Sequence, residues 1–122
     1  MKIKSISYPS KDEYYNQELI REVNSGIETV MGTVFLQKGS RIPNEGFSKH
    51  PFNEVSIIAK GCIEMLNEDG SILGYFEKGS VIYINAFEPQ AGNVLKDTEI
   101  MYVLNRPVIW LNDQVKHGAE NC

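Results

Sequence analysis

Residues 48–61, SKHPFNEVSIIAKG, carry the densest combination of structural and chemical signals in this 122-residue chain. The run at 55–59 is short, apolar and rich in β-branched residues, which is typical of a strand. A Lys-Gly pair follows it, where a turn or bulge is expected. His50 and Glu54 precede the run, and both side chains can point to one side of the strand. An imidazole nitrogen and a carboxylate oxygen are suitable ligands for a divalent metal.

Similar apolar runs recur along the chain at short intervals. They lie at residues 27–37, 62–66, 71–76, 81–84 and 99–104. Residues 67–70, NEDG, separate two of these runs and predict a hairpin. Strands at this spacing, with turn residues between them, indicate an all-β fold in which antiparallel strands form a sandwich or barrel.

Residues 11–23 are the one segment with a helical pattern. Tyr15, Leu19 and Val23 recur at a spacing of four, and Ser10 is a suitable N-cap. The same residues are also compatible with an edge strand or an irregular segment. A short N-terminal helix and an edge strand therefore both stay open at this point.

Length and charge exclude several classes of protein. A chain of 122 residues has room for one domain and one core. It carries 12 Lys and Arg against 16 Asp and Glu without a basic cluster, so we expect neither nucleic acid nor a membrane surface as a partner. Two cysteines, no apolar run of membrane-spanning length and no signal-peptide pattern predict a cytoplasmic protein.

The spacing His50…Glu54…Gly61 resembles the second half of the first cupin motif, G-x5-H-x-H-x3,4-E-x6-G. A counterpart of the second motif, G-x5-P-x-G-x2-H-x3-N, begins at Gly79 as GSVIYINAFEPQAGNV. The resemblance covers about residues 32–105. It implies an antiparallel double-sheet, jelly-roll-like cupin barrel of the single-domain (monocupin) type. Residues 1–122 would then form one domain, with a core at about 27–112, an N-terminal segment 1–26 and a frayed tail 113–122.

Several motif positions depart from the family pattern. Ser48 stands at the first histidine position, and the second motif has Asn85, Phe87, Gln90 and Val94 where the family has proline, glycine, histidine and asparagine. The resemblance therefore implies a reduced set of metal ligands, namely His50, Glu54 and Gln90. Such a set would hold a divalent ion such as Mn, Zn, Mg or Fe only weakly.

The matched motifs also suggest the residues of a ligand pocket and of proton transfer. The residues implied as ligand-binding are Ser48, Phe52, Tyr83, Phe87 and Tyr102. The alternative is that these aromatic rings belong to the barrel core. Glu54, Tyr83 and Glu88 are the candidates for catalytic proton transfer.

Three functions remain open from the sequence. The first is a cupin that binds a small organic molecule, a sugar or an organic acid, in the barrel mouth, with a partly degenerate metal site. The second is a metal-dependent non-redox enzyme, a lyase, isomerase or epimerase, in which His50 and Glu54 hold the ion. The third is a structural barrel with a packed interior. Family resemblance and the apolar segment around Trp110 also predict a homodimer.

Overall fold

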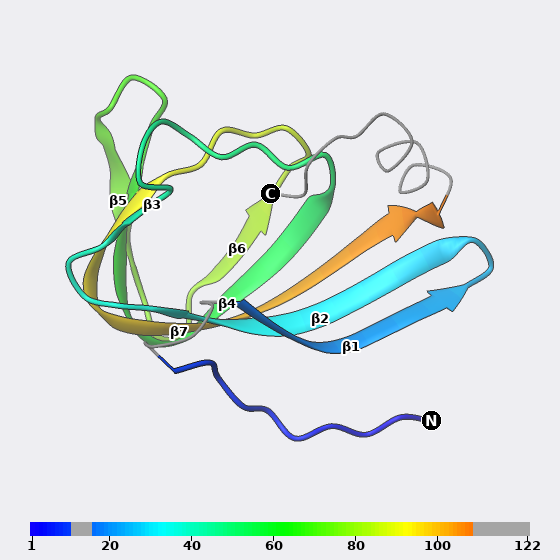
Figure 1. The fold of residues 1–122 in the computed structure, drawn as a ribbon. Coiled ribbons are helices and arrows are strands. Elements are labelled where there is room, and N and C mark those ends of the chain that lie inside the picture. The colour runs from blue at the N-terminus through cyan, green and yellow to red at the C-terminus, as the bar shows by residue number, and fades with distance from the viewer. Residues whose placement is uncertain (11–15, 109–122) are drawn as a thin grey trace.

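The computed structural model describes residues 1–10 and 16–108, and seven antiparallel strands make up its regular elements (Figure 1). The strands are β1 (Asn16–Asn24), β2 (Ile27–Leu36), β3 (Arg41–Ile42), β4 (Asn53–Leu66), β5 (Ile72–Glu77), β6 (Val81–Ile84) and β7 (Gly92–Pro107). The apolar segment around Trp110, predicted to lie in a dimer contact, and the tail 113–122 are outside the described residues. The antiparallel double-sheet barrel predicted from the sequence is confirmed.

Strands β4 and β7 pass through both sheets, because each changes neighbours along its length. One edge of β4 pairs first with β6 and then with β5, and its other edge pairs with β7. β7 pairs with β3 near its start and with β2 from residue 98 onward. One sheet therefore has the order β1-β2-β7-β4-β6, and the other has the order β3-β7-β4-β5.

A bulge in β4 at Gly61 lets the two long strands bend from one sheet into the other. The β4–β7 register shifts repeatedly between Ile58 and Ile63, and Gly61 has a φ of 98°. The fully buried Thr98 of β7 stabilises this point: its hydroxyl accepts a hydrogen bond from the Cys62 N–H at 3.1 Å. The same hydroxyl donates to the Lys96 carbonyl at 2.7 Å. The runs at 55–59 and 62–66 are thus one bent strand rather than two.

Alternation along the strands divides the side chains between an inner and an outer face. The buried core cluster consists of Leu36, Ile58, Ile63 and Val94, from β2, β4 and β7. The predicted hairpin at 67–70 is confirmed, and the Asn67 N–H donates to the Ser71 carbonyl at 2.7 Å. This core holds the two sheets together and leaves the inner face free on one side for the cavity described below.

The helical reading of residues 11–23 is wrong for the part that the structure describes. Residues 16–24 form β1, which pairs with β2 along its whole length. A bulge at Leu19 shifts the strand register between Glu18 and Ile20. The segment 1–26, expected outside the core, therefore supplies a strand of the main sheet. Residues 11–15 lie outside the described residues.

No helix among the described residues is long and apolar enough to cross a membrane.

We predict that Gly61→Ala destabilises the protein more than Gly79→Ala does. Both glycines have a positive φ, 98° and 93°, so both substitutions carry a backbone cost of about 1–2 kcal/mol. A Cβ at Gly61 would lie 2.4 Å from the Asp97 carbonyl oxygen, whereas one at Gly79 would meet nothing within 4 Å. The additional cost at Gly61 is about 1–3 kcal/mol. Urea unfolding of the two variants measures this difference, and equal losses would contradict the account of the bend.

Candidate functional site

A cavity of about 490 Å³ lies among the inward-facing side chains of the barrel. Its size is within the range of small-molecule sites. One part of its wall is apolar and merges with the core: Val34, Leu36, Ile42, Ile58, Ile63, Met65, Ile82 and Ile100. The rest of the wall is polar and comes from β1, β4, β7 and the segment that precedes β4.

His50 is the polar group of the cavity whose hydrogen bonding is least complete. Its Nδ1 atom is buried and has no hydrogen-bond partner among the described residues. Burial lowers the pKa of His50, which favours the neutral imidazole at neutral pH. The ring stacks on Phe52 at a centroid distance of 5.3 Å, and the Phe87 N–H donates to the His50 carbonyl at 2.6 Å. The imidazole is therefore held in place by its neighbours.

Glu54 and Ser56 point into the same cavity from the first half of β4. Burial raises the pKa of Glu54, and a hydrogen bond from the Ser56 hydroxyl at 3.1 Å opposes that rise only in part. A raised pKa favours the protonated carboxyl, which can donate a hydrogen bond as well as accept one. Together with His50, this gives the cavity two titratable groups whose charged forms are both disfavoured.

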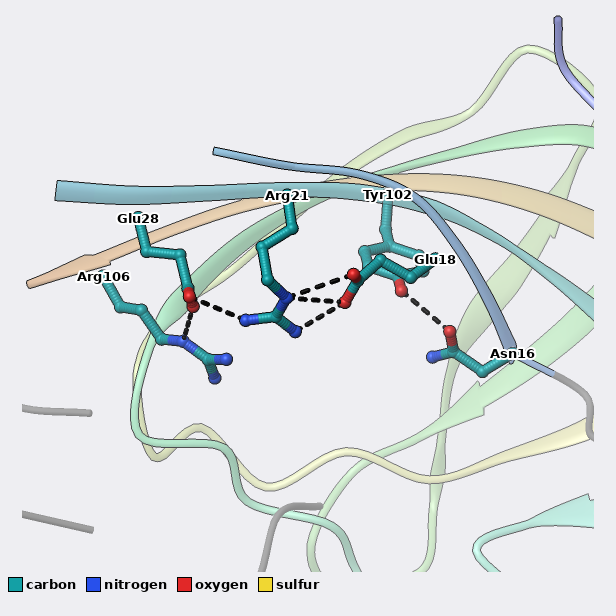
Figure 2. Close-up of polar contacts among 6 residues, drawn as sticks. All are labelled: Asn16, Glu18, Arg21, Glu28, Tyr102 and Arg106. Carbon is teal, nitrogen blue, oxygen red and sulfur yellow. Dashed lines mark hydrogen bonds and ion pairs between the residues drawn. The ribbon is translucent and has the colours of Figure 1, made fainter. Parts of the chain in front are cut away.

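A network of ion pairs around the buried Glu28 lies beside another part of the wall, where Glu18, Arg21 and Arg106 line the cavity (Figure 2). The Glu28 carboxylate is 3% exposed and lies between two guanidinium groups, at 2.7 Å from Arg21 and 2.8 Å from Arg106. Arg21 also donates to Glu18 at 3.0 Å. Burial by itself would raise the pKa of Glu28, but the hydrogen bonds from the two arginines outweigh it, and the net shift is downward. The network therefore keeps Glu28 ionised.

Tyr102 closes the polar wall at the other end of this network (Figure 2). Its hydroxyl donates to the Asn16 side-chain oxygen at 2.8 Å, and burial is the main cause that raises its pKa. The ring passes over Gly32, where a Cβ would come within 2.5 Å of the tyrosine oxygen. A glycine at this position of β2 therefore makes room for the buried tyrosine.

The structure brings six of the sequence-predicted site residues together and leaves three outside. Those that line the cavity are Ser48, His50, Phe52, Glu54, Gln90 and Tyr102. Backbone hydrogen bonds of 2.9 Å in both directions between Ser48 and Gln90 join the two segments that carry the matched motifs. The roles of these residues in binding or catalysis stay predictions.

Tyr83, Phe87 and Glu88 do not line the cavity. Tyr83 is 58% exposed because Ile82 and Ile84 take the inward positions of β6. Phe87 is 63% exposed and has a φ of 63°, and the Glu88 carboxylate accepts hydrogen bonds from Asn85 instead. We therefore leave these three residues out of the candidate site.

Sequence reasoning missed the charged network of Arg21, Glu28 and Arg106. Arg21 lies in the segment 11–23, whose pattern is compatible with a helix, and Arg106 lies at the end of β7. Glu28 gave the clearest signal, because a carboxylate two residues before the buried Val30 shares its inward face. A charge on the inner face of an apolar strand requires a partner of opposite charge.

The described residues fit a metal site only in part. His50, Glu54 and Gln90 line one cavity, and neutral imidazole is the form that binds metals. However, no three His, Cys, Asp or Glu residues of the described chain are grouped so that they could hold an ion. A raised pKa at Glu54 also means that a metal would have to compete with a proton for this carboxylate. Among the described residues, His50, Glu54 and Gln90 would form an incomplete metal shell.

Comparison with solved structures identifies the fold as the double-stranded β-helix of cupins. An RmlC-like cupin family protein from Methanocaldococcus jannaschii matches with a TM-score of 0.56 and 15% identity, over 92% of this chain and 99% of that one. A protein of unknown function from Rhizobium leguminosarum matches with a TM-score of 0.61 and 16% identity, over 85% and 97%. The DMSP lyase DddQ from Ruegeria pomeroyi gives 0.51 and 22%, over 64% of this chain and 38% of the lyase.

The chain thus has a cupin fold, as its two motif remnants implied. No protein-family model and no curated protein sequence matches it.

We predict that Glu28→Gln destabilises the protein by about 3 kcal/mol at neutral pH, because it leaves two guanidinium groups without their buried carboxylate. Glu18→Gln is the matched control. It breaks a more exposed pair with the same Arg21, with Glu18 40% exposed, and should cost about 1 kcal/mol or less. Denaturant unfolding of both variants measures the difference.

The same carboxylate makes stability depend on pH in the acid range. The folded-state pKa of Glu28 lies below 4.5, so its contribution is complete above that pH and is lost as pH falls through the folded value. The wild type should lose stability in this range more steeply than Glu28→Gln does. Parallel pH curves for the two proteins would rule out the ion-pair network as the source.

Proposed function

We propose that the protein binds a small organic molecule in the barrel cavity. The observation that carries the proposal is the cavity, which is large enough for a ligand and is lined by His50, a residue whose buried Nδ1 atom has no hydrogen-bond partner among the described residues. A buried polar atom without a partner costs about 1–3 kcal/mol. A ligand that forms a hydrogen bond with the imidazole after a rotation of the ring would recover this free energy.

Of the two ligand classes, an organic acid with an apolar body suits the cavity better than a sugar. The apolar wall from Leu36 to Ile100 would leave many sugar hydroxyls without hydrogen bonds. Three cationic side chains, Arg21, Lys49 and Arg106, line the cavity against two carboxylates, Glu18 and Glu54, so the lining has a small excess of positive charge, although Glu28 pairs with both arginines. The raised pKa of Glu54 reduces its repulsion of a ligand carboxylate.

A thermal-shift and calorimetric screen tests the proposal with two probe sets, short aliphatic carboxylates such as hexanoate and neutral hexoses such as glucose. We expect the carboxylates to stabilise the protein, by about 2.7 kcal/mol at 100 times the dissociation constant. The hexoses should have little effect. If hexoses bind and carboxylates do not, the choice of ligand class is wrong, although ligand binding itself stands.

We predict that His50→Ala weakens the binding of the best carboxylate by about tenfold, since it removes one hydrogen bond to the ligand. Phe87→Ala is the control, because Phe87 lies close to His50 through its backbone but its side chain is exposed outside the cavity. Titration calorimetry of the two variants measures the effect. Equal affinities for both variants would place the ligand away from His50.

A metal-dependent lyase, isomerase or epimerase is the second candidate. It is favoured by His50 and Glu54 lining one cavity and by the fold shared with the Ruegeria pomeroyi lyase. In such an enzyme the ion would polarise a carbonyl or hydroxyl group of the substrate. His50, Glu54 and Gln90 would hold it, and water would complete the shell.

Metal content separates the two candidates. The untagged protein is purified, incubated with Mn²⁺, Zn²⁺ or Fe²⁺, desalted and analysed by elemental spectrometry. One ion per chain in the wild type, lost in both His50→Ala and Glu54→Gln, would establish the metal site. From the incomplete ligand set we expect less than one ion per chain to survive desalting.

A further inference from the structure

The bridge between Ser48 and Gln90 joins the two loops that border the polar part of the cavity. One loop precedes β4 and the other follows β6, and they lie side by side (Figure 1). The Ser48 N–H donates to the Gln90 carbonyl and the Gln90 N–H donates to the Ser48 carbonyl, both at 2.9 Å. Residues that exchange both backbone hydrogen bonds lie directly opposite each other and share a face. Here that face is the cavity wall, which both residues line.

The two side chains carry hydrogen-bonding groups that the described residues do not use. Both residues are half-buried, and neither the Ser48 hydroxyl nor the Gln90 amide has a hydrogen bond to another described residue. A hydroxyl opposite an amide can bond to it, as the Thr29 hydroxyl does to the Asn105 side-chain oxygen at 2.6 Å across β2 and β7. The Ser48–Gln90 pair has the same chemistry and the same cross-strand placement, but its groups are left for a molecule in the cavity.

Contacts of Arg41 hold the loop that carries Ser48 in one position. The Arg41 guanidinium donates to the carbonyls of Pro43 at 2.8 Å and Gly46 at 3.0 Å, and it lies over the Phe47 ring at 5.7 Å. Arg41 itself is fixed by the pairing of β3 with β7. A binding group on an ordered backbone loses little conformational entropy when a ligand arrives. The bridge is therefore prepared for binding.

The chemistry of the two groups suits a carboxylate better than a metal ion. Neither a hydroxyl nor an amide carries a negative charge, so neither offsets the charge of a divalent ion. Both groups are hydrogen-bond donors, through the hydroxyl proton of Ser48 and the two amide protons of Gln90. A carboxylate has two oxygens that only accept, so it can take one hydrogen bond from each residue. Hydrogen bonds to a charged acceptor are also stronger than those between neutral groups.

We propose that Ser48 and Gln90 form a clamp that holds the carboxylate of the ligand by direct hydrogen bonds, without a metal ion. This inference rests on the proposed binding of an organic acid and names the residues that recognise its acidic group. One carboxylate oxygen accepts from the Ser48 hydroxyl and the other from the Gln90 amide. The apolar body of the ligand then lies against the apolar wall, to which Leu36 and Ile58 belong.

The test compares three probes that share one chain length, namely hexanoate, hexanamide and hexanol, by titration calorimetry on the whole chain. The protein is used as purified and also after treatment with EDTA and desalting. The variants are Ser48→Ala and Gln90→Glu, which remove donors of the clamp. Thr29→Val is the matched control, because it removes a hydroxyl from a residue that does not line the cavity. Thermal unfolding verifies that each variant folds, and the two clamp variants break no side-chain hydrogen bond among the described residues.

We expect the wild type and Thr29→Val to bind hexanoate equally well, with or without EDTA treatment, and hexanol at least about tenfold more weakly. Ser48→Ala should weaken hexanoate binding by about tenfold, since it removes one hydrogen bond to a charged group. Gln90→Glu should weaken it by about a hundredfold, because it replaces amide donors by a like charge. The same variant should prefer hexanamide to hexanoate, since the amide N–H groups can donate to the new carboxylate.

The outcomes separate the clamp from the proposed function. Hexanoate binding that neither Ser48→Ala nor Gln90→Glu weakens would overturn the clamp and leave the proposed function standing. Binding that EDTA treatment abolishes would assign the acidic group to a metal ion and would also overturn the clamp. If hexoses bind and hexanoate does not, the clamp fails together with the choice of ligand class. If none of the probes binds, the clamp and the proposed function fail together.

Discussion

The contact between Gly61 and Thr98 is the constraint on which the rest of the barrel depends. Only a residue without a side chain fits at 61, because the Asp97 carbonyl and Thr98 occupy the space of a Cβ. The Thr98 hydroxyl then bonds the irregular backbone on both strands. This single junction turns two long strands into members of two sheets. A glycine bulge of this kind bends a strand, and the bend encloses the inner face of the barrel.

The polar wall of the cavity follows from strand register rather than from any local motif. Arg21 lies opposite Val30, and Glu18 lies opposite Gly32, so both point to the inner face although they are three residues apart. The bulge at Leu19 makes this possible, because an extra residue restores the inward direction of the next side chain. A strand without the bulge would have sent one of the two charges to the solvent.

The sequence allowed the strands, the hairpin at 67–70 and the cupin-like barrel to be predicted, because alternation and turn residues are local signals. It also selected His50 and Glu54, whose spacing is itself a motif. It did not decide between a helix and an edge strand for β1, because the local pattern is compatible with both and the pairing with β2 selects the strand. Tyr83 was predicted to line the pocket and lies outside it for a related reason. The pairing of β6 with β4 decides which residues of this short apolar strand point inward.

The two polar parts of the cavity differ in how far their hydrogen bonding is complete. Glu28 is held by two guanidinium groups, and removal of either partner would leave a buried charge, so this network stabilises the fold. His50 has a buried nitrogen without a partner among the described residues, and the half-buried Glu54 carboxyl accepts a hydrogen bond from Ser56. Incomplete hydrogen bonding lowers the stability of the fold, so a role in binding a ligand would explain why this side of the cavity carries His50 and Glu54. The His50–Glu54 side of the cavity is therefore where binding and specificity should be sought.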